Sequence, residues 1–297
     1  MEKVAKIKEK RNVYSPFTII MGIVLALYAV TLIVLLGWAV ITGCKSQDDF
    51  YVNKYKLPTE WYWNFEYVYS QFTVTIQTEL GSRNVGMPEM YMNSILYSVG
   101  CAFAATLVPC ITAYACAKYE YRFSKIVYSI VLVAMIVPFV GSLPAEVRMA
   151  QRFRLYNHIW GMWIMKANFL GMYFLVFYAG FKCQPKAYME AATVDGAGNW
   201  RIMTQISLPL IRNLFFTVIL INFITFWNDY QSPLVYLPSY PTVAYGMFKI
   251  KDTVINGMST VPMRMAATTM MLAPVIILFA LFSKRLLGNL SIGGIKG

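Results

Sequence analysis

The sequence contains few of the residues on which soluble proteins and enzymes depend. Only 13% of its 297 residues are charged, against roughly 25% in soluble proteins, whereas 58% are hydrophobic. It has one histidine, His158, and almost no acidic residue within its apolar runs. A membrane-embedded enzyme needs converging nucleophiles, carboxylates or metal ligands, and an ion-coupled secondary transporter usually buries similar groups. Both classes are therefore disfavoured, and a polytopic membrane protein is the class that remains.

Other absences narrow the function further. No G-x-x-x-x-G-K-S/T phosphate-binding loop is present, so the chain is not expected to bind or hydrolyse a nucleotide. The net charge is +12, but there is no long basic run and no aromatic-basic RNA motif, which argues against a nucleic-acid partner. Three of the five cysteines lie in one apolar segment, and none has metal-ligand spacing with His158. The cysteines are therefore interpreted as free thiols that pack like small side chains, and no metal site is expected.

Six apolar segments predict six transmembrane helices in an all-α protein. The first, residues 17–41, is long enough for a hydrocarbon core of roughly 30 Å and too long for a signal peptide, so it is expected to be an anchor helix. The others are expected near 95–117, 126–140, 159–181, 214–227 and 266–282. Lys166 lies in the fourth segment; snorkelling towards the outer membrane face is favoured over a functional role.

The distribution of charge predicts the orientation. With both termini in the cytoplasm, segments 1–16, 118–125, 182–213 and 284–297 lie inside and hold 15 basic against 5 acidic residues. The outer segments 44–94, 141–158 and 228–264 hold 10 against 9. This agrees with the positive-inside rule. Only the loop with Arg148, Arg152 and Arg154 runs against it, and either an interfacial helix or a partner contact would account for that loop.

Between the fourth and fifth apolar segments lies a polar stretch with a regular pattern, residues 184–213. Pro185 suits the first position of a short helix, and Asp195-Gly196 then predicts a turn in which Gly196 takes a positive φ. Asn199 is expected to cap a second helix that stops near Pro209. Small side chains allow another protein to approach this stretch closely. An ordinary connecting helix-turn-helix without a partner is the alternative.

The residues of this stretch read E-A-A-x-x-D-G-A and, after a gap, I-x-L-P-L. This pattern resembles the EAA loop of ABC importer permeases, a cytoplasmic coupling helix seated in a groove of the ATPase subunit. The resemblance implies a coupling role for Glu190, Ala191, Ala192, Asp195, Gly196, Ala197, Leu208 and Pro209. Asn213 stands where the family often has proline, which leaves the start of the next helix less well defined.

The resemblance extends over most of the chain and favours the carbohydrate-uptake branch. Matching segments include Asn93-Ser94, Leu155-Tyr156-Asn157 and Phe226-Trp227-Asn228-Asp229, and the glycine-rich end is similar to that of the smaller maltose-permease subunit. The family implies a heterodimer of related permeases, two ATPase subunits that bind ATP and Mg²⁺, and an extracytoplasmic sugar-binding protein, in a bacterial or archaeal cytoplasmic membrane. A permease for another solute, such as a polyamine, is the alternative.

In this interpretation the chain is one permease domain, residues 1–297. It comprises a cytoplasmic N-terminus (1–16), a first helix (17–41), an extracytoplasmic segment (44–94), a five-helix core (95–283) with the coupling loop 184–213, and a cytoplasmic tail (284–297).

Two further sites are expected. Trp227, Asn228, Asp229 and Gln231 combine an aromatic ring with hydrogen-bonding groups, as a sugar site requires, although an interface anchor at Trp227 and a helix cap at Asn228 would explain them equally. The tail cannot fold alone, and the resemblance implies that Ser291, Gly293, Gly294 and Lys296 contact the ATPase subunits.

Overall fold

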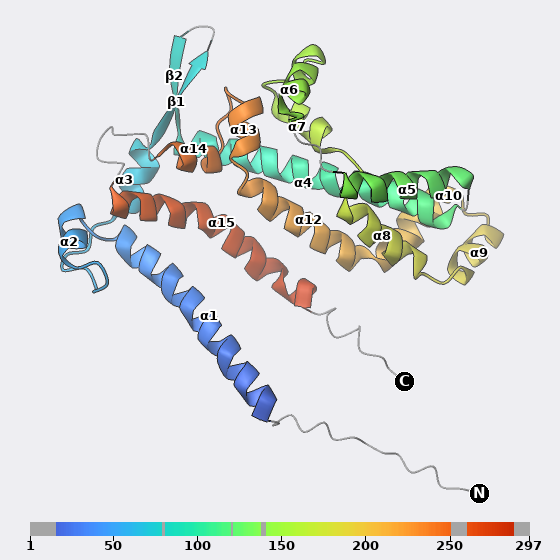
Figure 1. The fold of residues 1–297 in the computed structure, drawn as a ribbon, viewed down its shortest axis with the longest axis horizontal. Helices are drawn as coiled ribbons and strands as arrows, with labels where there is room; N and C mark the ends of the chain where they lie inside the picture. The colour runs from blue at the N-terminus through green and yellow to red at the C-terminus, as the bar shows by residue number, and fades with distance from the viewer. Residues whose placement is uncertain (1–15, 79–80, 120, 138–140, 251–259, 288–297) are drawn as a thin grey trace, which may run out of the picture.

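The computed structural model describes residues 16–78, 81–119, 121–137, 141–250 and 260–287, which form a mostly helical protein (Figure 1). In chain order the elements are α1 (Pro16–Gly43), α2 (Gln47–Val52), α3 (Asn64–Gln71), β1 (Thr73–Thr78), β2 (Gly81–Gly86), α4 (Met87–Lys118), α5 (Arg122–Ile136), α6 (Leu143–Arg152), α7 (Ile159–Lys166), α8 (Met172–Lys182), α9 (Ala187–Val194), α10 (Asn199–Ile202), η1 (Met203–Ser207), α11 (Leu208–Leu210), α12 (Arg212–Trp227), α13 (Gln231–Tyr236), α14 (Val243–Lys249) and α15 (Val261–Leu287).

Helix α4 is the axis of the fold. It has 32 residues, which corresponds to about 48 Å, so it extends beyond a hydrocarbon core of roughly 30 Å. Helices α7, α8 and α12 pack along it. Pro109 lies buried inside α4 and leaves the helix unbroken, as is tolerated where neighbouring helices surround the freed backbone carbonyl.

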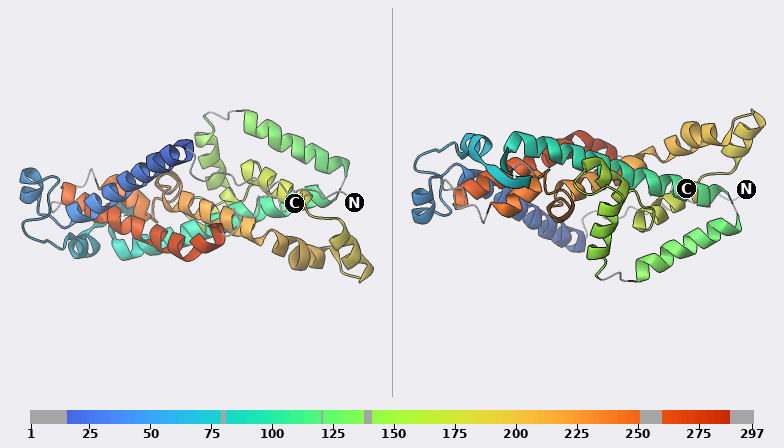
Figure 2. Two further views of the ribbon diagram at one scale, coloured as in Figure 1. Left: turned by 90° about the horizontal axis from the view of Figure 1, so that it is seen from below. Right: turned by 90° about the horizontal axis from the view of Figure 1, so that it is seen from above.

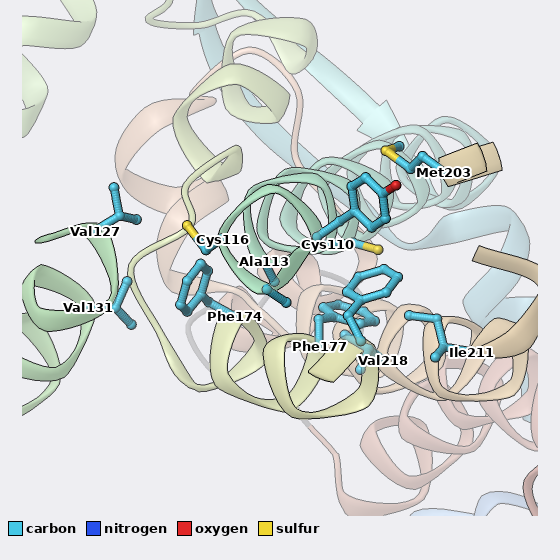
Figure 3. Packing of buried hydrophobic residues seen from close by; sticks show 13 residues of the cluster. Cys110, Ala113, Cys116, Val127, Val131, Phe174, Phe177, Met203, Ile211 and Val218 are labelled. Carbon is cyan, nitrogen blue, oxygen red and sulfur yellow. The ribbon is translucent and has the colours of Figure 1, made fainter. Parts of the chain in front are cut away.

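The largest core cluster joins α4 to α5, α8 and α12 (Figure 3). Phe174, Phe177 and Phe181 follow one face of α8 and are fully buried, and they pack against Ala113 and the cysteine side chains of α4. Four cysteines, Cys44, Cys101, Cys110 and Cys116, are buried free thiols, which confirms their packing role; Cys183 is exposed.

Helix α1 has little contact with the rest of the chain. An 18-residue stretch of α1 has a mean hydropathy of 2.9, and no part of this stretch is buried. The C-terminal end of α1 meets α15. Towards its N-terminus, α1 diverges from the other helices (Figure 1). Because so apolar a surface is unstable in water, this helix requires lipid or another protein around it.

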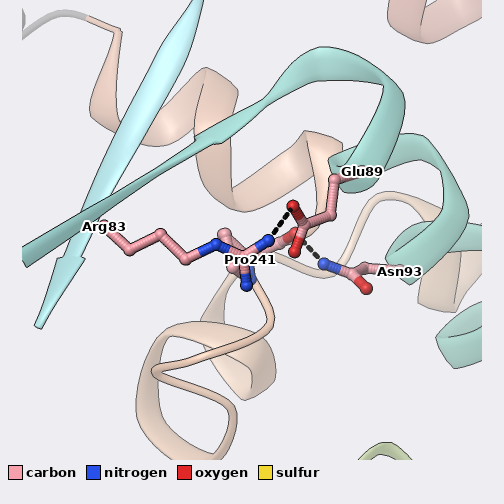
Figure 4. Close-up of polar contacts among 4 residues, drawn as sticks. All are labelled: Arg83, Glu89, Asn93 and Pro241. Carbon is pink, nitrogen blue, oxygen red and sulfur yellow. Dashed lines mark hydrogen bonds and ion pairs between the residues drawn. The ribbon is translucent and has the colours of Figure 1, made fainter. Parts of the chain in front are cut away.

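The segment between α1 and α4 folds into two short helices and a β-hairpin, and the hairpin corrects the all-α expectation. Strands β1 and β2 pair antiparallel from Thr73–Gly86 to Thr78–Gly81. Figure 4 shows two contacts of α4 at this end: Arg83 of β2 forms an ion pair with Glu89 of α4 (2.7 Å). The Asn93 amide of α4 donates to the carbonyl of Pro241, in the loop before α14 (3.1 Å).

A buried lysine organises the loop that precedes the hairpin. Lys45 is 1% exposed, and its ammonium donates to the carbonyls of Asn53 and Lys56 (2.6 Å to the latter). The Asp49 carboxylate accepts from the Thr59 hydroxyl (2.7 Å), which holds the pKa of Asp49 below its ordinary value. The lysine therefore occupies a cage of oxygens in the way that a bound cation would.

Two expected spans differ from the sequence interpretation. The fourth is not continuous: the helix stops at Lys166 and resumes at Met172, so α7 and α8 are separate. The third, α5, ends at Ile136 and is 15 residues long. Both segments are too short to count as full spans alone.

Among the described residues, three helices are long and apolar enough to cross a membrane: Pro16–Gly43, Met87–Lys118 and Val261–Phe282. A fourth is obtained if Asn199–Leu210 and Arg212–Trp227, which meet at 78°, form one broken span. A multi-pass membrane protein follows from these helices, whereas the number six and the orientation remain predictions.

Candidate functional site

The stretch 184–213 folds into a compact helical knob at one end of the bundle. Helix α9 starts at Ala187, so Pro185 lies before the helix and not at its first position, which corrects the expectation. Helix α9 ends in a Schellman motif: the Gly196 N–H donates to the Thr193 carbonyl (3.0 Å) and the Ala197 N–H to the Ala192 carbonyl (2.9 Å). Gly196 has φ +78°, which confirms the positive φ expected from the sequence.

The second half of the knob is less regular than predicted. Gly198, and not Asn199, occupies the N-cap of α10, and no side chain caps this helix. The chain then passes through a π-helical stretch, Met203–Ser207, before α11 and the bend at Ile211 into α12. π-Helical turns often occur at functional sites, and here the turn lies just before the 78° bend.

Two contacts fix the knob to the bundle. The Gln184 amide donates to the Ser207 carbonyl (2.8 Å), which ties the start of the segment to its π-helical end. Met203 and Ile211 are buried in the core cluster of α4 and α8. The start and the second half of the knob are therefore both attached to the rest of the protein.

The eight predicted coupling residues all lie in the knob, but they differ in how far they are exposed to solvent. Ala192 is 7% exposed and holds α9 against α10, while Ala197 and Leu208 are half-buried. The remaining five are exposed: Glu190, Ala191, Asp195, Gly196 and Pro209.

Sequence reasoning missed the large apolar side chains around these residues. Val194 is 88% exposed and Trp200 69%, with Tyr188 and Leu210 also exposed. Exposed apolar groups gathered on one rigid knob indicate a protein contact surface. The signal was available in the sequence as Trp200 within a polar stretch.

The end of α12 departs from both expectations for Trp227. This side chain is 2% exposed, its indole N–H donates to the Met271 carbonyl (3.0 Å), and its ring stacks on Phe223. An indole with its N–H paired and its faces covered can neither stack on a sugar nor anchor in the interface. In this structure Trp227 joins α12 to α15, and its place in the substrate pathway stays a prediction that these contacts do not support.

The three polar residues that follow have local roles. The Asn228 amide donates to the Ile224 carbonyl (2.8 Å) at the end of α12, which confirms the capping interpretation. Asp229 accepts from the Tyr97 hydroxyl (2.9 Å) and from the Ser232 N–H (3.0 Å), so it connects α4 to the start of α13. Gln231 begins α13 and is exposed.

A cavity that sequence reasoning missed lies beside this cluster. It has a volume of about 430 Å³, and its polar lining comprises Lys166, Asn168, Asn222 and Tyr173, with Phe226 beside them. The Lys166 ammonium donates to the Ser232 hydroxyl (3.1 Å) and lies 5.9 Å from the centre of the Phe226 ring. Lys166 is therefore half-buried beside the cavity and paired with Ser232, and its snorkelling towards the membrane face stays a prediction.

The loop that carries the three arginines contains helix α6. Arg148, Arg152 and Arg154 are exposed, and Arg154 has a φ of +56° just after the helix. The Tyr236 hydroxyl donates to Glu146 (3.0 Å), and burial together with this carboxylate raises the pKa of Tyr236 to about 12. The Ser142 hydroxyl is the main cause that lowers the pKa of Glu146.

The two remaining expectations concern the C-terminal tail and metal binding. The tail residues Ser291, Gly293, Gly294 and Lys296 lie outside the described residues. Within the part of the chain that the structure describes, no group of three or more His, Cys, Asp or Glu residues is arranged to hold a metal ion.

Known proteins resemble this chain along most of its length. Residues 105–290 match the family model described as "Binding-protein-dependent transport system inner membrane component". The diacetylchitobiose uptake system permease protein NgcG of Streptomyces coelicolor is 26% identical over 93% of this chain and 88% of the relative. The melibiose/raffinose/stachyose import permease protein MelC of Bacillus subtilis is 27% identical over 70% of this chain and 75% of the relative.

Among solved structures, a chain of a bacterial ABC transporter for the acidic polysaccharide alginate aligns with a TM-score of 0.74. The alignment covers 91% of this chain and 98% of that chain at 22% identity, which shows a shared fold. Because the family match covers more than half of the sequence and includes the whole knob, the chain belongs to the inner membrane components of binding-protein-dependent transport systems.

Proposed function

We propose that this protein is a permease subunit of an ATP-driven importer and forms a translocation pathway with a second, related permease. The observation that carries the proposal is the rigid, exposed knob of α9–α11, whose charged rim and apolar residues suit docking into a groove of an ATPase subunit. Partner ATPases would bind ATP and Mg²⁺, and their closure would move the knob and, through Ile211, helix α12. This chain transmits that motion and does not hydrolyse ATP.

In the proposed topology six segments cross a bacterial or archaeal cytoplasmic membrane, with both termini inside. Helices α7 and α8 together make the fourth crossing, and α5 makes the third. The excess of basic residues on the knob side supports this orientation. It places the hairpin and α6 outside, where a solute-binding protein would dock.

The proposed cargo is a carbohydrate, of oligosaccharide size. Relatives with this domain import diacetylchitobiose and the melibiose/raffinose/stachyose group, which supports the assignment. The cavity beside α7 agrees with it, since amide groups and aromatic rings are the side chains that hold sugars. A polyamine is less suitable, because Lys166 would place a positive charge against a polycation.

The test is reconstitution of the chain with its related permease, its ATPases and its binding protein in vesicles. ATP-dependent uptake of an oligosaccharide, measured beside spermidine uptake, is expected for the sugar only. Uptake of spermidine alone would overturn the carbohydrate assignment, whereas no co-purifying ATPase would overturn the permease assignment. In the same system, deletion of residues 291–297 is expected to lower ATPase activity while membrane insertion is retained.

A further inference from the structure

The segment at the end of α2 and just after it carries four large apolar side chains that are exposed. They are Tyr51 (66%), Val52 (80%), Tyr55 (86%) and Leu57 (65%). Single exposed apolar side chains are common on protein surfaces, whereas four within seven residues indicate contact with an apolar environment. We refer to residues 51–57 as the tyrosine loop.

Hydrogen bonds from buried polar side chains fix the backbone of the tyrosine loop. The Lys45 ammonium donates to the carbonyls of Asn53 and Lys56, which lie on either side of Tyr55. The Asn53 amide in turn donates to the carboxylate of Asp49 in α2 (3.3 Å). Because the backbone is held on both sides of Tyr55, the exposure of this ring is a property of the folded loop and does not result from a frayed end.

The tyrosine loop folds back along α1, the most apolar of the candidate membrane spans. The indole N–H of Trp38 in α1 donates to the Lys54 carbonyl (3.0 Å), and the Trp38 and Tyr55 rings have their centroids 6.5 Å apart. Trp38 lies five residues before Gly43, the last residue of α1, which corresponds to about 7.5 Å along the helix axis. The loop therefore returns towards the middle of the span and does not project beyond its end.

This return brings the loop to the depth of the membrane–water interface. The uncharged run 17–41 covers about 37 Å as a helix, whereas the hydrocarbon core is roughly 30 Å thick, with a headgroup region of roughly 5–7 Å on each side. When the run is centred in the membrane, Trp38 lies at the edge of the core. Tryptophan and tyrosine are the residues that favour this depth, and the exposed Lys54 and Lys56 can extend from it to the headgroups.

The loop also lies on a different side of α1 from the neighbouring helix α15. Gly43 packs on α15 so closely that a Cβ added to it would lie 3.1 Å from the backbone of Ala266. Trp38, five residues earlier, lies about 140° around the helix from Gly43. Both views of Figure 2 show α2 and the loop after it at the end of the molecule opposite the knob. The tyrosine loop therefore covers a side of α1 that is turned away from α15.

We propose that the tyrosine loop inserts into the lipid interface at the C-terminal end of α1 and anchors that end of the helix in the membrane. Tyr55 and Leu57 would enter the edge of the hydrocarbon core beside Trp38, while Lys54 and Lys56 would lie among the headgroups. The anchor would fix the depth of α1, whose apolar surface is otherwise exposed. This inference rests on α1 crossing a membrane and is independent of which solute the transporter carries.

The test measures the surroundings of a fluorescent label in the complete transporter, reconstituted in phosphatidylcholine–phosphatidylglycerol vesicles. Cys183, the exposed native thiol, is replaced by serine, and the label is attached through Val52→Cys or Tyr55→Cys. Ser82→Cys is the matched control, because Ser82 is exposed on the hairpin, which points away from α1 (Figure 1). Labels at positions 52 and 55 are expected to emit at shorter wavelength and to be quenched more by brominated lipid than by aqueous iodide. The label at position 82 should show the reverse.

A pair of variants tests which side chains hold the loop in the interface. With the label at position 52, Tyr55→Asp/Leu57→Asp should abolish both the short-wavelength emission and the quenching by brominated lipid, because carboxylates are unfavourable at the edge of the hydrocarbon core. Tyr55→Trp/Leu57→Met keeps the apolar character of both residues and should leave both signals unchanged. Co-purification with the partner subunits shows that each variant is assembled. Should the aspartate variant fail to assemble, the quenching measured without it still decides the proposal.

Three results would overturn the proposal. Iodide quenching at positions 52 and 55 as strong as at position 82 would show that the loop is in water. A shift in emission that occurs only when the solute-binding protein is added would make the loop a docking surface for that protein. A photoreactive group at position 55 that links to the related permease in place of lipid would make it a subunit interface. None of these results affects the importer assignment, which ATP-dependent uptake decides.

Discussion

Substitution of Gly196 tests the knob most directly. The residue has φ +78°, and a Cβ placed on it would meet no atom within 4 Å. Any cost of a side chain at this position is therefore conformational and not steric. For a residue with a Cβ, the left-handed region costs about 1–2 kcal/mol, and valine is among the residues that it suits least.

That cost is expected to appear as a change in the population of docked knobs. A penalty of about 1–2 kcal/mol lowers the equilibrium ratio of the formed Schellman turn to competing conformations by roughly 5- to 30-fold. Gly196→Val should lower ATPase co-purification and solute uptake by up to that factor, while membrane insertion is unchanged. Both are measured in reconstituted vesicles with equal amounts of inserted protein.

Two variants control for the side chain itself. Gly196→Asn adds a larger polar group, but asparagine adopts positive φ with little strain, so coupling should be largely retained. Gly198→Ser adds a side chain two residues later, where φ is −70° and serine is a favoured N-cap, and it should leave coupling intact. If Gly196→Val transports normally, or if Gly196→Asn fails as severely as valine, the turn is not what couples the knob to its partner.

Further outcomes follow from the buried polar groups. Trp227→Ala should destabilise the protein by about 3–5 kcal/mol, seen in thermal unfolding in detergent, whereas Asn228→Ala should cost about 1 kcal/mol; equal effects would contradict the buried position of the indole. Lys45→Ala leaves two carbonyls without a donor and should make the outer loop sensitive to proteolysis, which Lys45→Arg would relieve in part. Because the Thr59 hydroxyl lowers the pKa of Asp49, its contribution to stability is present above the ordinary value of 3.8 and is lost as pH falls through the lower folded value. Acid should therefore release α2, as followed by hydrogen exchange, and Asp49→Asn should remove that pH dependence.

Local residue chemistry was enough to predict the turn of the knob but not the details of its second half. Asp195-Gly196 has one favourable turn conformation, because glycine alone enters the positive-φ region without strain, and the structure has that turn. Long uncharged runs likewise predicted α1, α4 and α15, since an apolar run of such length has few stable environments other than a membrane. Both features depend on residues that are close together in the chain, so they could be predicted directly from the sequence.

Contacts between segments far apart in the chain could not be predicted from the sequence in this way. Trp227 looked like an exposed ring because its neighbours are polar, but α15 covers it and Met271 accepts its N–H. Lys166 was assigned to a continuous span, yet the chain leaves the helix after it and its ammonium meets Ser232, 66 residues away. The sequence by itself determined the membrane class and the Asp195-Gly196 turn of the knob, through hydropathy and backbone conformation. Only the tertiary structure decided which polar and aromatic groups are already paired, because that depends on which helices pack together.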